Sequence, residues 1–376
     1  MRLPLRPILI SAVALVVGCS GGSPSPADPR PVPSQPGSLP LLDPGPLMGV
    51  IYSQPEPGAE PALDAAFAAS QSAGALGYEL SIAWHALESS PGVVDLSFAQ
   101  LLLDTLEASG MTPYLVLTTI DTVQLSVPPD LQDPGDSTEL APGLAWDDPA
   151  MLGRFEMLLD GLVPLLVAKG GFYLSVGNEV DAWLGARLGQ VSSYSNFVDH
   201  ARSYAQAIEP GLAIGVTATF DVVANQPLLL DQLQSVSDRV AFTYYPLNGD
   251  FSVRPPAEVA ADLALLRAAN GPGPMLLQEV GYPAGLTSGP TNGSSEAAQR
   301  AFVENVFAYL QTDPDLRFVS FLHLADWTAA DLDLFETYYG ISDPAFREFL
   351  GTLGMHQQDG TARLAWAAYL AGLNDL

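Results

Sequence analysis

The segment "FYLSVGNEVDAWL", residues 172–184, is an apolar run that stops abruptly on an amide and a carboxylate, Asn178 and Glu179. Further along the chain, "PMLLQEVGYP" (274–283) repeats the pattern and ends on Glu279. Continuous apolar runs without strict alternation are typical of parallel strands that are buried on both faces. A carboxylate at the end of such a strand therefore needs an explanation other than burial.

Runs of the same kind recur after residue 47. They cover 48–53, 78–84, 113–120, 172–179, 213–219, 239–246, 274–282 and 318–327. Most of the intervals between them have helical periodicity, and 295–311 opens with a serine suited to cap a helix. Strand–helix units repeated in this number predict a single (β/α)₈ TIM barrel. A doubly wound sheet usually carries a Gly-rich phosphate turn, and the sequence contains neither G-x-G-x-x-G nor a P-loop.

A barrel would bring the two glutamates together. The functional residues of such barrels lie where the strands end, at the C-terminal face. Glu179 ends the fourth predicted strand and Glu279 the seventh, so both are expected in one cleft. The long interval 121–149 is too rich in Pro and Asp for a helix throughout and is expected to shape that cleft. Trp146 within it either offers a platform to a sugar ring or packs the loop onto the barrel.

The N-terminal segment is expected to lie outside the barrel. Residues 1–18 combine a basic start with an apolar run too short to span a bilayer, which predicts a signal peptide. Residues 19–46 are dense in Pro, Ser and Gly and predict a disordered linker, so that the barrel domain covers 47–376.

The end of the signal peptide, "VVGCS" (16–20), resembles a bacterial lipobox. The resemblance implies cleavage before Cys19, lipidation of that residue and anchoring in the cell envelope, with Ser20 favouring the outer membrane. The alternative is an ordinary signal peptide with an incidental cysteine. Cys19 is the only cysteine, so an intramolecular disulfide is excluded.

Charge and motif content exclude several classes of function. Lys and Arg total 14 against 42 Asp and Glu, a formal net charge of -28, which argues against nucleic acid and anionic polysaccharides as partners. The chain has no H-E-x-x-H or CxxC motif, so no catalytic metal or cofactor is expected. Its G-x-S-x-G match, "GCSGG" (18–22), falls where the predicted signal peptide ends and not between a strand and a helix, so no serine-hydrolase elbow is expected. A Ca²⁺ ion held by loop carboxylates stays open, and a monomer is expected.

Hydrolysis of a glycosidic bond needs two carboxyl groups, one that protonates the leaving oxygen and one that attacks the anomeric carbon. "GNE" (177–179) and the glutamate that ends the seventh strand resemble clan A glycoside hydrolases, which are retaining (β/α)₈ enzymes. The resemblance implies that Glu179 is the general acid/base, that Glu279 is the nucleophile and that Asn178 binds the sugar's 2-hydroxyl. "FTYYPL" (242–247) followed by "LLQEVGYP" (276–283) is most similar to the endo-β-1,4-galactanases of family 53.

The resemblance also implies supporting residues. A Tyr at the end of the sixth strand would hold the nucleophile ionised; we favour Tyr245, although Tyr244 is its neighbour and alternation leaves the inward-facing one open. Trp327, which ends the eighth strand, would floor the subsite of the cleaved sugar, unless it is a core Trp at the rim. Trp84 follows the second strand and is expected to border the cleft.

One position departs from the clan. Many members carry an Arg in the second strand that supports the nucleophile, whereas "YELSIAW" (78–84) has Glu79. Either another residue supports Glu279, or Glu79 points away, or this chain works differently.

Three functions follow as hypotheses. The first is a surface-tethered retaining glycosidase that cleaves a neutral β-linked polysaccharide or oligosaccharide, galactan among them. The second is a carbohydrate-binding lipoprotein that has lost catalysis. The third is a structural envelope protein on a barrel scaffold, because fold does not fix function.

Overall fold

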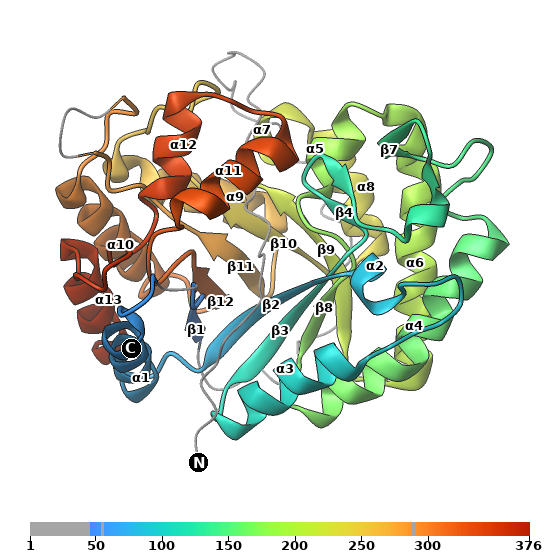
Figure 1. The fold of residues 1–376 in the computed structure, drawn as a ribbon, viewed down its shortest axis with the longest axis horizontal. Coiled ribbons are helices and arrows are strands. Elements are labelled where there is room, and N and C mark those ends of the chain that lie inside the picture. The colour runs from blue at the N-terminus through green and yellow to red at the C-terminus, as the bar shows by residue number, and fades with distance from the viewer. Residues whose placement is uncertain (1–45, 54–55, 287–290) are drawn as a thin grey trace.

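The computed structural model describes residues 46–53, 56–286 and 291–376. Its parallel strands form a barrel in the order β1-β12-β11-β10-β9-β8-β3-β2, which confirms the predicted (β/α)₈ fold (Figure 1). The strands are β1 (Leu47–Val50), β2 (Gly77–Ala83), β3 (Thr112–Thr118), β8 (Tyr173–Ser175), β9 (Ala213–Thr219), β10 (Arg239–Tyr244), β11 (Met275–Val280) and β12 (Leu316–Phe321).

The predicted signal peptide, Cys19 and all but the last residue of the predicted linker lie outside the described residues. Within the described part of the chain, no helix combines the length and hydropathy that a membrane span requires.

Two glycines allow the ring of strands to close between β1 and β2. A Cβ atom on Gly49 of β1 would lie 2.6 Å from the carbonyl oxygen of Gly77 on β2. A Cβ atom on Gly77 would in turn lie 2.9 Å from the Phe318 ring on β12. Because real Cβ atoms do not approach other heavy atoms so closely, only glycine permits the two backbones to come together here.

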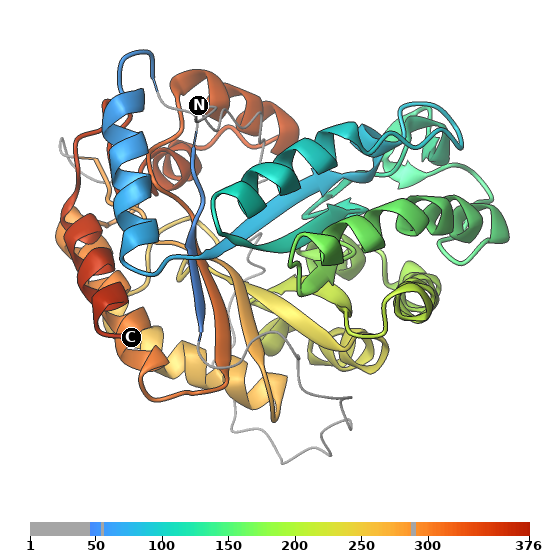
Figure 2. The same cartoon turned by 90° about the horizontal axis from the view of Figure 1, so that it is seen from below.

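Helices surround the barrel on its outer side (Figure 2). The longer ones are α1 (Glu60–Ser72), α3 (Ser97–Ala108), α4 (Pro149–Ala168), α6 (Val191–Ile208), α8 (Pro227–Val236), α9 (Val259–Asn270), α10 (Glu296–Leu310) and α13 (Leu364–Asn374). The Ser295 side chain accepts a hydrogen bond from the amide of Ala298, as a capping serine should. Each helix buries an apolar stripe against the outer face of the strands, and this layer is the main core of the protein.

The inside of the barrel changes from apolar to polar toward the C-terminal ends of the strands. Near the N-terminal ends, the Tyr114 ring stacks on Tyr173 at 4.9 Å and on Phe318 at 4.8 Å between ring centroids. On β3 the next inward residue is the apolar Val116. On five other strands the residues at this level are polar and buried; they are Glu79, Ser175, Thr217, Gln278 and Ser320. The aromatic layer therefore forms a floor beneath a layer of buried polar side chains at the C-terminal ends of the strands, which we call the chamber.

The segment between β12 and α13 covers part of the chamber. It contains α11 (Ala329–Tyr339) and α12 (Pro344–Gly351), which lie side by side in Figure 1. Their apolar side chains pack with Tyr245, Leu322 and Trp327 from the strand ends. The end of α11 also reaches the long loop after β3, because Gln124 donates to the carbonyl oxygen of Tyr338 at 2.8 Å.

That long loop contains two short hairpins rather than a helix throughout. The first pairs β4 (Ile120–Asp121) with β5 (Gln124–Leu125), and the second pairs β6 (Gln132–Asp133) with β7 (Asp136–Leu140). The first hairpin adjoins the end of β8, because the amide of Asn178 donates to the carbonyl oxygen of Ile120 at 2.9 Å. The loop therefore forms one wall of the polar chamber.

The closure contact predicts that Gly49→Ala destabilises the fold by about 1–3 kcal/mol, since the added methyl group meets the Gly77 backbone, which cannot yield as a flexible side chain could. Gly153→Ala is the matched control, because a Cβ atom at this position of α4 meets nothing within 4 Å. The control should be neutral or more stable, since Ala favours helix. Urea unfolding of both variants measures the difference. Equal stabilities would show that the contact is dispensable.

Candidate active site

Glu179 is held at the mouth of the barrel by a constrained backbone. It follows β8 and precedes α5 (Val180–Gly185), with φ at 47°, in the left-handed region that non-glycine residues rarely adopt. The neighbouring Asn178 carbonyl accepts from the amide of Thr122 at 2.9 Å, which ties the turn to the β4 hairpin. Backbone strain of this kind persists where the surroundings enforce it, and it is common at functional sites.

Glu279 owes its inward position to a bulge in β11. Leu277 pairs with Phe242 of β10, but the next residue of β10, Thr243, pairs with Glu279, so Gln278 is an extra residue. The pairing of β11 with β12 shifts in the same stretch, between Leu277 and Val280. The bulge breaks the alternation of side chains, and Gln278 and Glu279 both enter the hydrogen-bond network of the chamber.

The surroundings of Glu179 favour its neutral form. The side chain is completely buried, and the pKa of its carboxyl is raised well above the ordinary range by burial first and by the charge of Glu279 second. Two hydroxyls oppose this shift: Thr122 donates to Oε2 at 3.1 Å and Thr243 donates to Oε1. Burial is the larger effect, so Glu179 keeps a proton where an exposed glutamate would have lost it.

Glu279 has stronger support for its charge. Tyr245 donates to Oε2 at 2.7 Å, and the Gln278 amide donates to Oε1 at 3.3 Å. Burial raises the pKa of Glu279, but these two hydrogen bonds are the next largest influences and lower it. Two glutamates in one chamber therefore have environments that push their pKa values apart, which is the arrangement that acid and base roles require.

Asn178 connects the two glutamates through neighbouring side chains. Its Oδ1 accepts from the Gln278 amide at 2.8 Å, and its Nδ2 donates to Asp121 Oδ1 at 3.1 Å. Asp121 also accepts from the Tyr338 hydroxyl at 2.8 Å, and burial raises the pKa of this carboxyl to about 6. The amide of Asn178 is thereby fixed in one orientation.

The two tyrosines at the end of the sixth barrel strand face opposite sides. Tyr245 points inward and bonds Glu279, which settles the choice that alternation left open. Tyr244 ends β10 but points into the helix layer, where its hydroxyl donates to Asp262 of α9 at 2.7 Å. Tyr244, the alternative that the sequence left open, is therefore directed away from Glu279 and from the chamber.

The three tryptophans that the sequence suggested for the site also differ in position. Trp327 lies with the site, its ring stacked on His323 at 4.5 Å, and its indole nitrogen has no partner among the described residues. Trp84 packs on Phe155 of α4 and donates to Glu88, within the helix layer. Trp146 is fully buried beside Trp183 of α5 and packs the long loop onto the helices. Trp84 therefore packs in the helix layer instead of bordering the chamber. For Trp146 the structure shows the second of the two alternatives, packing of the loop.

Several residues of the chamber are not predicted as site residues from the sequence. They are Asp121, Thr122, Thr243, Gln278, His323 and Tyr338. Asp121 carried a usable signal, because an acidic residue directly after an apolar strand is the pattern that identified Glu179. The other positions gave none: a threonine inside a strand or a tyrosine in a late helix is ordinary in sequence.

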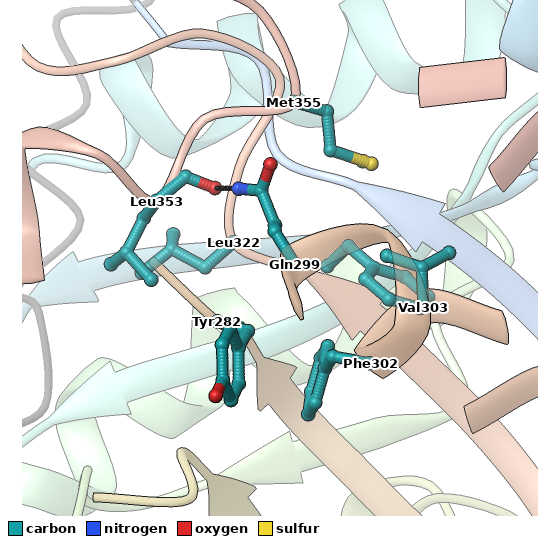
Figure 3. A pocket seen from close by; sticks show the side chains of 9 residues that line it. Tyr282, Gln299, Phe302, Val303, Leu322, Leu353 and Met355 are labelled. Carbon is teal, nitrogen blue, oxygen red and sulfur yellow. Dashed lines mark hydrogen bonds between the residues drawn. The ribbon is translucent and has the colours of Figure 1, made fainter. Parts of the chain in front are cut away.

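A separate small pocket lies between the ends of β11 and β12 and helix α10 (Figure 3). Its lining is apolar, with Phe302, Val303 and Met355 among its side chains. The amide of Gln299 beside it is already occupied by the carbonyl oxygen of Leu353 at 3.1 Å. The pocket has no carboxylate and is a packing gap. Among the described residues, no group of His, Cys, Asp or Glu side chains is placed to hold a metal ion.

The fold resembles solved glycoside hydrolases at low sequence identity. The GH5_18 protein from Streptomyces cattleya, in complex with GlcNAc, shares 16% identity over 87% of this chain and 79% of its own, with a TM-score of 0.64. The exo-β-1,4-mannosidase Op5Man5 from Opitutaceae bacterium strain TAV5 shares 17% identity over 88% of this chain and 59% of its own, with a TM-score of 0.63.

A family 39 glycoside hydrolase from Bacteroides cellulosilyticus WH2 shares 14% identity over 90% of this chain and 65% of its own, with a TM-score of 0.56. No family model and no curated protein matches the sequence. The structural neighbours thus belong to families of clan A, the clan that the sequence resembles, whereas family 53 is not among those named here. Identities this low establish the shared fold alone.

Asp181 fixes the turn that carries Glu179. Its two carboxylate oxygens accept from the amide of Thr219 at 2.8 Å and from the hydroxyl of Thr219 at 2.6 Å. Asp181→Ala would leave both buried donors unsatisfied, and we expect the free energy of unfolding to fall by about 2 kcal/mol or more. The control Asp160→Ala removes one bond from the Tyr204 hydroxyl at the surface and should change stability by less than about 0.5 kcal/mol. Denaturant titration of both variants gives the comparison, and a tolerated Asp181→Ala would contradict the role.

Proposed function

We propose that the protein is a retaining glycoside hydrolase that cleaves β-linked neutral sugars, with Glu179 as general acid/base and Glu279 as nucleophile. The observation that carries the proposal is the pair of buried glutamates, brought from β8 and β11 into electrostatic contact and given opposite environments. Burial keeps a proton on Glu179, whereas Tyr245 and Gln278 stabilise charge on Glu279.

The reaction takes two steps. In the first, a Glu279 oxygen forms a bond to the anomeric carbon while the glycosidic bond breaks and its oxygen takes the proton of Glu179. The products are a glycosyl ester on Glu279, the free alcohol and an ionised Glu179. In the second, Glu179 removes a proton from water, the water oxygen bonds the anomeric carbon, and the ester bond breaks. The sugar leaves with its original configuration, and both glutamates return to their starting states.

The surrounding side chains fit this chemistry. Asn178 has a fixed orientation beside Glu179, which suits a hydrogen bond to the 2-hydroxyl that strengthens in the transition state. Trp327 offers an apolar ring surface to the sugar, together with an unpartnered indole N–H. Tyr245 donates to the carboxylate of the proposed nucleophile and favours its ionised form, against the burial that raises the pKa of Glu279 to about 7.

Charge indicates the class of substrate. The described chamber holds the buried carboxyls of Glu79, Asp121, Glu179 and Glu279, and the whole chain has a net charge of -28. A uronic acid or sulfated sugar would be repelled, so neutral sugars fit best. One structural neighbour is an exo-β-1,4-mannosidase, and another was solved with Manβ1-4GlcNAc, which makes β-mannosides the first probes and galactan the second.

The proposed setting is the cell envelope. Lipidation of Cys19 would hold the enzyme at a membrane surface, and the Pro-rich linker would separate the barrel from it. Metabolic labelling with a fatty-acid analogue, compared between the full-length chain and Cys19→Ala, tests the anchor independently of the activity. Equal labelling of the two would exclude Cys19 as the lipidated residue.

Glu179→Ala and Glu279→Ala should each lower kcat/KM on the hydrolysed substrate by at least about 10³-fold, because each removes a group that bonds or protonates the reacting atoms. The soluble part, residues 20–376, would first be screened against β-mannosides, β-glucosides and galactan. Glu304→Ala is the control, since Glu304 lies on the outer surface paired with Arg300. Glycan hydrolysis that survives in both glutamate variants would refute the assignment.

Added azide distinguishes the general acid/base from the nucleophile, because each variant should give a different glycosyl azide. With an activated aryl glycoside the leaving group needs no proton, so Glu179→Ala should still form the glycosyl enzyme, and azide should release it as a β-glycosyl azide. In Glu279→Ala, azide should instead replace the missing nucleophile and give the α-glycosyl azide. Product NMR distinguishes the anomers. The reverse assignment of products would exchange the roles of the two residues.

A non-catalytic carbohydrate-binding protein is the second candidate. It is favoured by one observation, the acidic Glu79 at a position where clan members carry an Arg that supports the nucleophile. Calorimetric binding of the oligosaccharides in the same panel, paired with an assay for released reducing sugar, separates the two functions. Binding with no product from any member would favour this candidate.

A further inference from the structure

Glu79 is an acidic side chain that the proposed reaction does not use. It lies on β2 and is 1% exposed. Its neighbours Leu80 and Ile82 belong to the core shared with the helices, so by alternation Glu79 points into the barrel. Among the described residues, neither of its carboxyl oxygens has a hydrogen-bond partner.

The contacts around β1 place this carboxyl in the chamber above the aromatic floor. A Cβ atom on Gly77, the previous inward residue of β2, would lie 2.9 Å from the Phe318 ring. Ser320 is the next inward residue of β12 after Phe318. Gly49 of β1 lies between the two strands and has no side chain, and a Cβ atom there would lie 3.6 Å from the Ser320 hydroxyl. That hydroxyl is also unpartnered among the described residues.

The ionisable groups that act on Glu79 are all acids. Glu279 of β11 and Asp121 of β4 raise its pKa, after burial itself, and no basic side chain contributes. The tyrosines whose own pKa values it influences are Tyr78 on β2, Tyr114 on β3 and Tyr245 on β10. The hydroxyl of Tyr114 is already directed to Thr217 and Gln278, at 3.3 and 3.4 Å.

An ionised carboxylate in this place would be costly. It would be buried without a hydrogen bond and would face other acids, and both effects favour the neutral form. A neutral carboxyl is a hydrogen-bond donor and needs an acceptor. Of the two acids that act on it, Glu279 has the larger influence, and each oxygen of Glu279 accepts only one of the described hydrogen bonds, so capacity remains.

We propose that Glu79 is a positioning residue that keeps a proton and donates it in a hydrogen bond to the carboxylate of Glu279. A neutral acid would thus supply the support that an Arg supplies in clan members. The two carboxyls would share one proton, and the singly protonated pair would be the active form. The inference rests on the proposed role of Glu279 as nucleophile.

The first test measures stability and needs no substrate. A shared proton means that the folded pair binds more protons than the unfolded chain at pH values above about 4.3, so folding stability falls as pH rises through that region. Urea unfolding of wild type, Glu79→Gln, Glu279→Gln and the double variant between pH 4.5 and 8.5 isolates the pair from the other carboxyls. In Glu79→Gln the free energy of unfolding should fall less steeply as the pH rises.

The double-variant cycle shows whether the proton is shared. Without the charge of Glu279, Glu79 should ionise more easily, so in the Glu279→Gln background the loss of stability that depends on Glu79 should move to lower pH. A loss at the same pH in both backgrounds, or no effect of Glu79→Gln at any pH, would overturn the proposal.

The second test separates positioning from packing. Glu79→Gln keeps an N–H donor and should retain kcat/KM within about 10-fold, whereas Glu79→Leu, which has none, should lose roughly 100-fold or more. The substrate is the 2,4-dinitrophenyl β-glycoside of whichever sugar the panel releases, because its departure needs no proton from Glu179. The fall of kcat/KM for this substrate at alkaline pH should then report loss of the shared proton. This fall should disappear in Glu79→Gln.

The outcomes distinguish this inference from the proposed function. Equal kcat/KM and pH profiles in Glu79→Leu and wild type would overturn the role of Glu79 while leaving the two-glutamate mechanism intact. If Glu279→Ala kept full activity, the proposed function would fail, and the stability cycle would still report whether the carboxyls share a proton. Turnover confined to substrates with a free amino group would overturn the inference in favour of an ionised Glu79 that binds an ammonium group.

Discussion

The hydrogen bond from Gln278 to Asn178, 2.8 Å long, joins the two halves of the candidate site across the barrel. Each partner is the immediate neighbour of one glutamate, so the bond fixes Glu179 and Glu279 relative to one another although they are far apart along the chain. It depends on two irregularities, the left-handed turn after β8 and the bulge in β11. Both are local departures from regular strand geometry, and they persist because the surrounding closed ring of strands enforces them.

The same chamber concentrates acids that a folding chain would ordinarily keep in water. Glu79, Asp121, Glu179 and Glu279 are all buried, and burial raises the pKa of each. Folding must retain protons there or supply donors, and hydroxyls of Thr122, Thr243, Tyr245 and Tyr338 supply them in part. Burial of these carboxyls lowers the stability of the fold at the place where reactive carboxyls are required. The extensive apolar layer between strands and helices offsets this cost.

Much of this architecture could be predicted from the sequence, because burial on both faces produces apolar runs that are visible without coordinates. Each predicted strand corresponds to a barrel strand, and Ser295 caps its helix as expected. The direction of individual side chains was harder. Regular alternation could not choose between Tyr244 and Tyr245, and it cannot foresee that a bulge turns both Gln278 and Glu279 inward. The sequence left open whether Trp146 packs or binds, because aromatic rings serve both purposes, and it did not show that Trp84 turns toward the helices.

The bulge in β11 also constrains how this gene can change. Loss of a single codon between those for Leu276 and Val280 would restore regular pleating, and one of the two inward side chains would turn toward the helices. The surface turns between helices have no such restriction, since their residues can be inserted or lost without altering the direction of a neighbour. Related genes should therefore vary freely in loop length while the number of residues in this one strand stays constant.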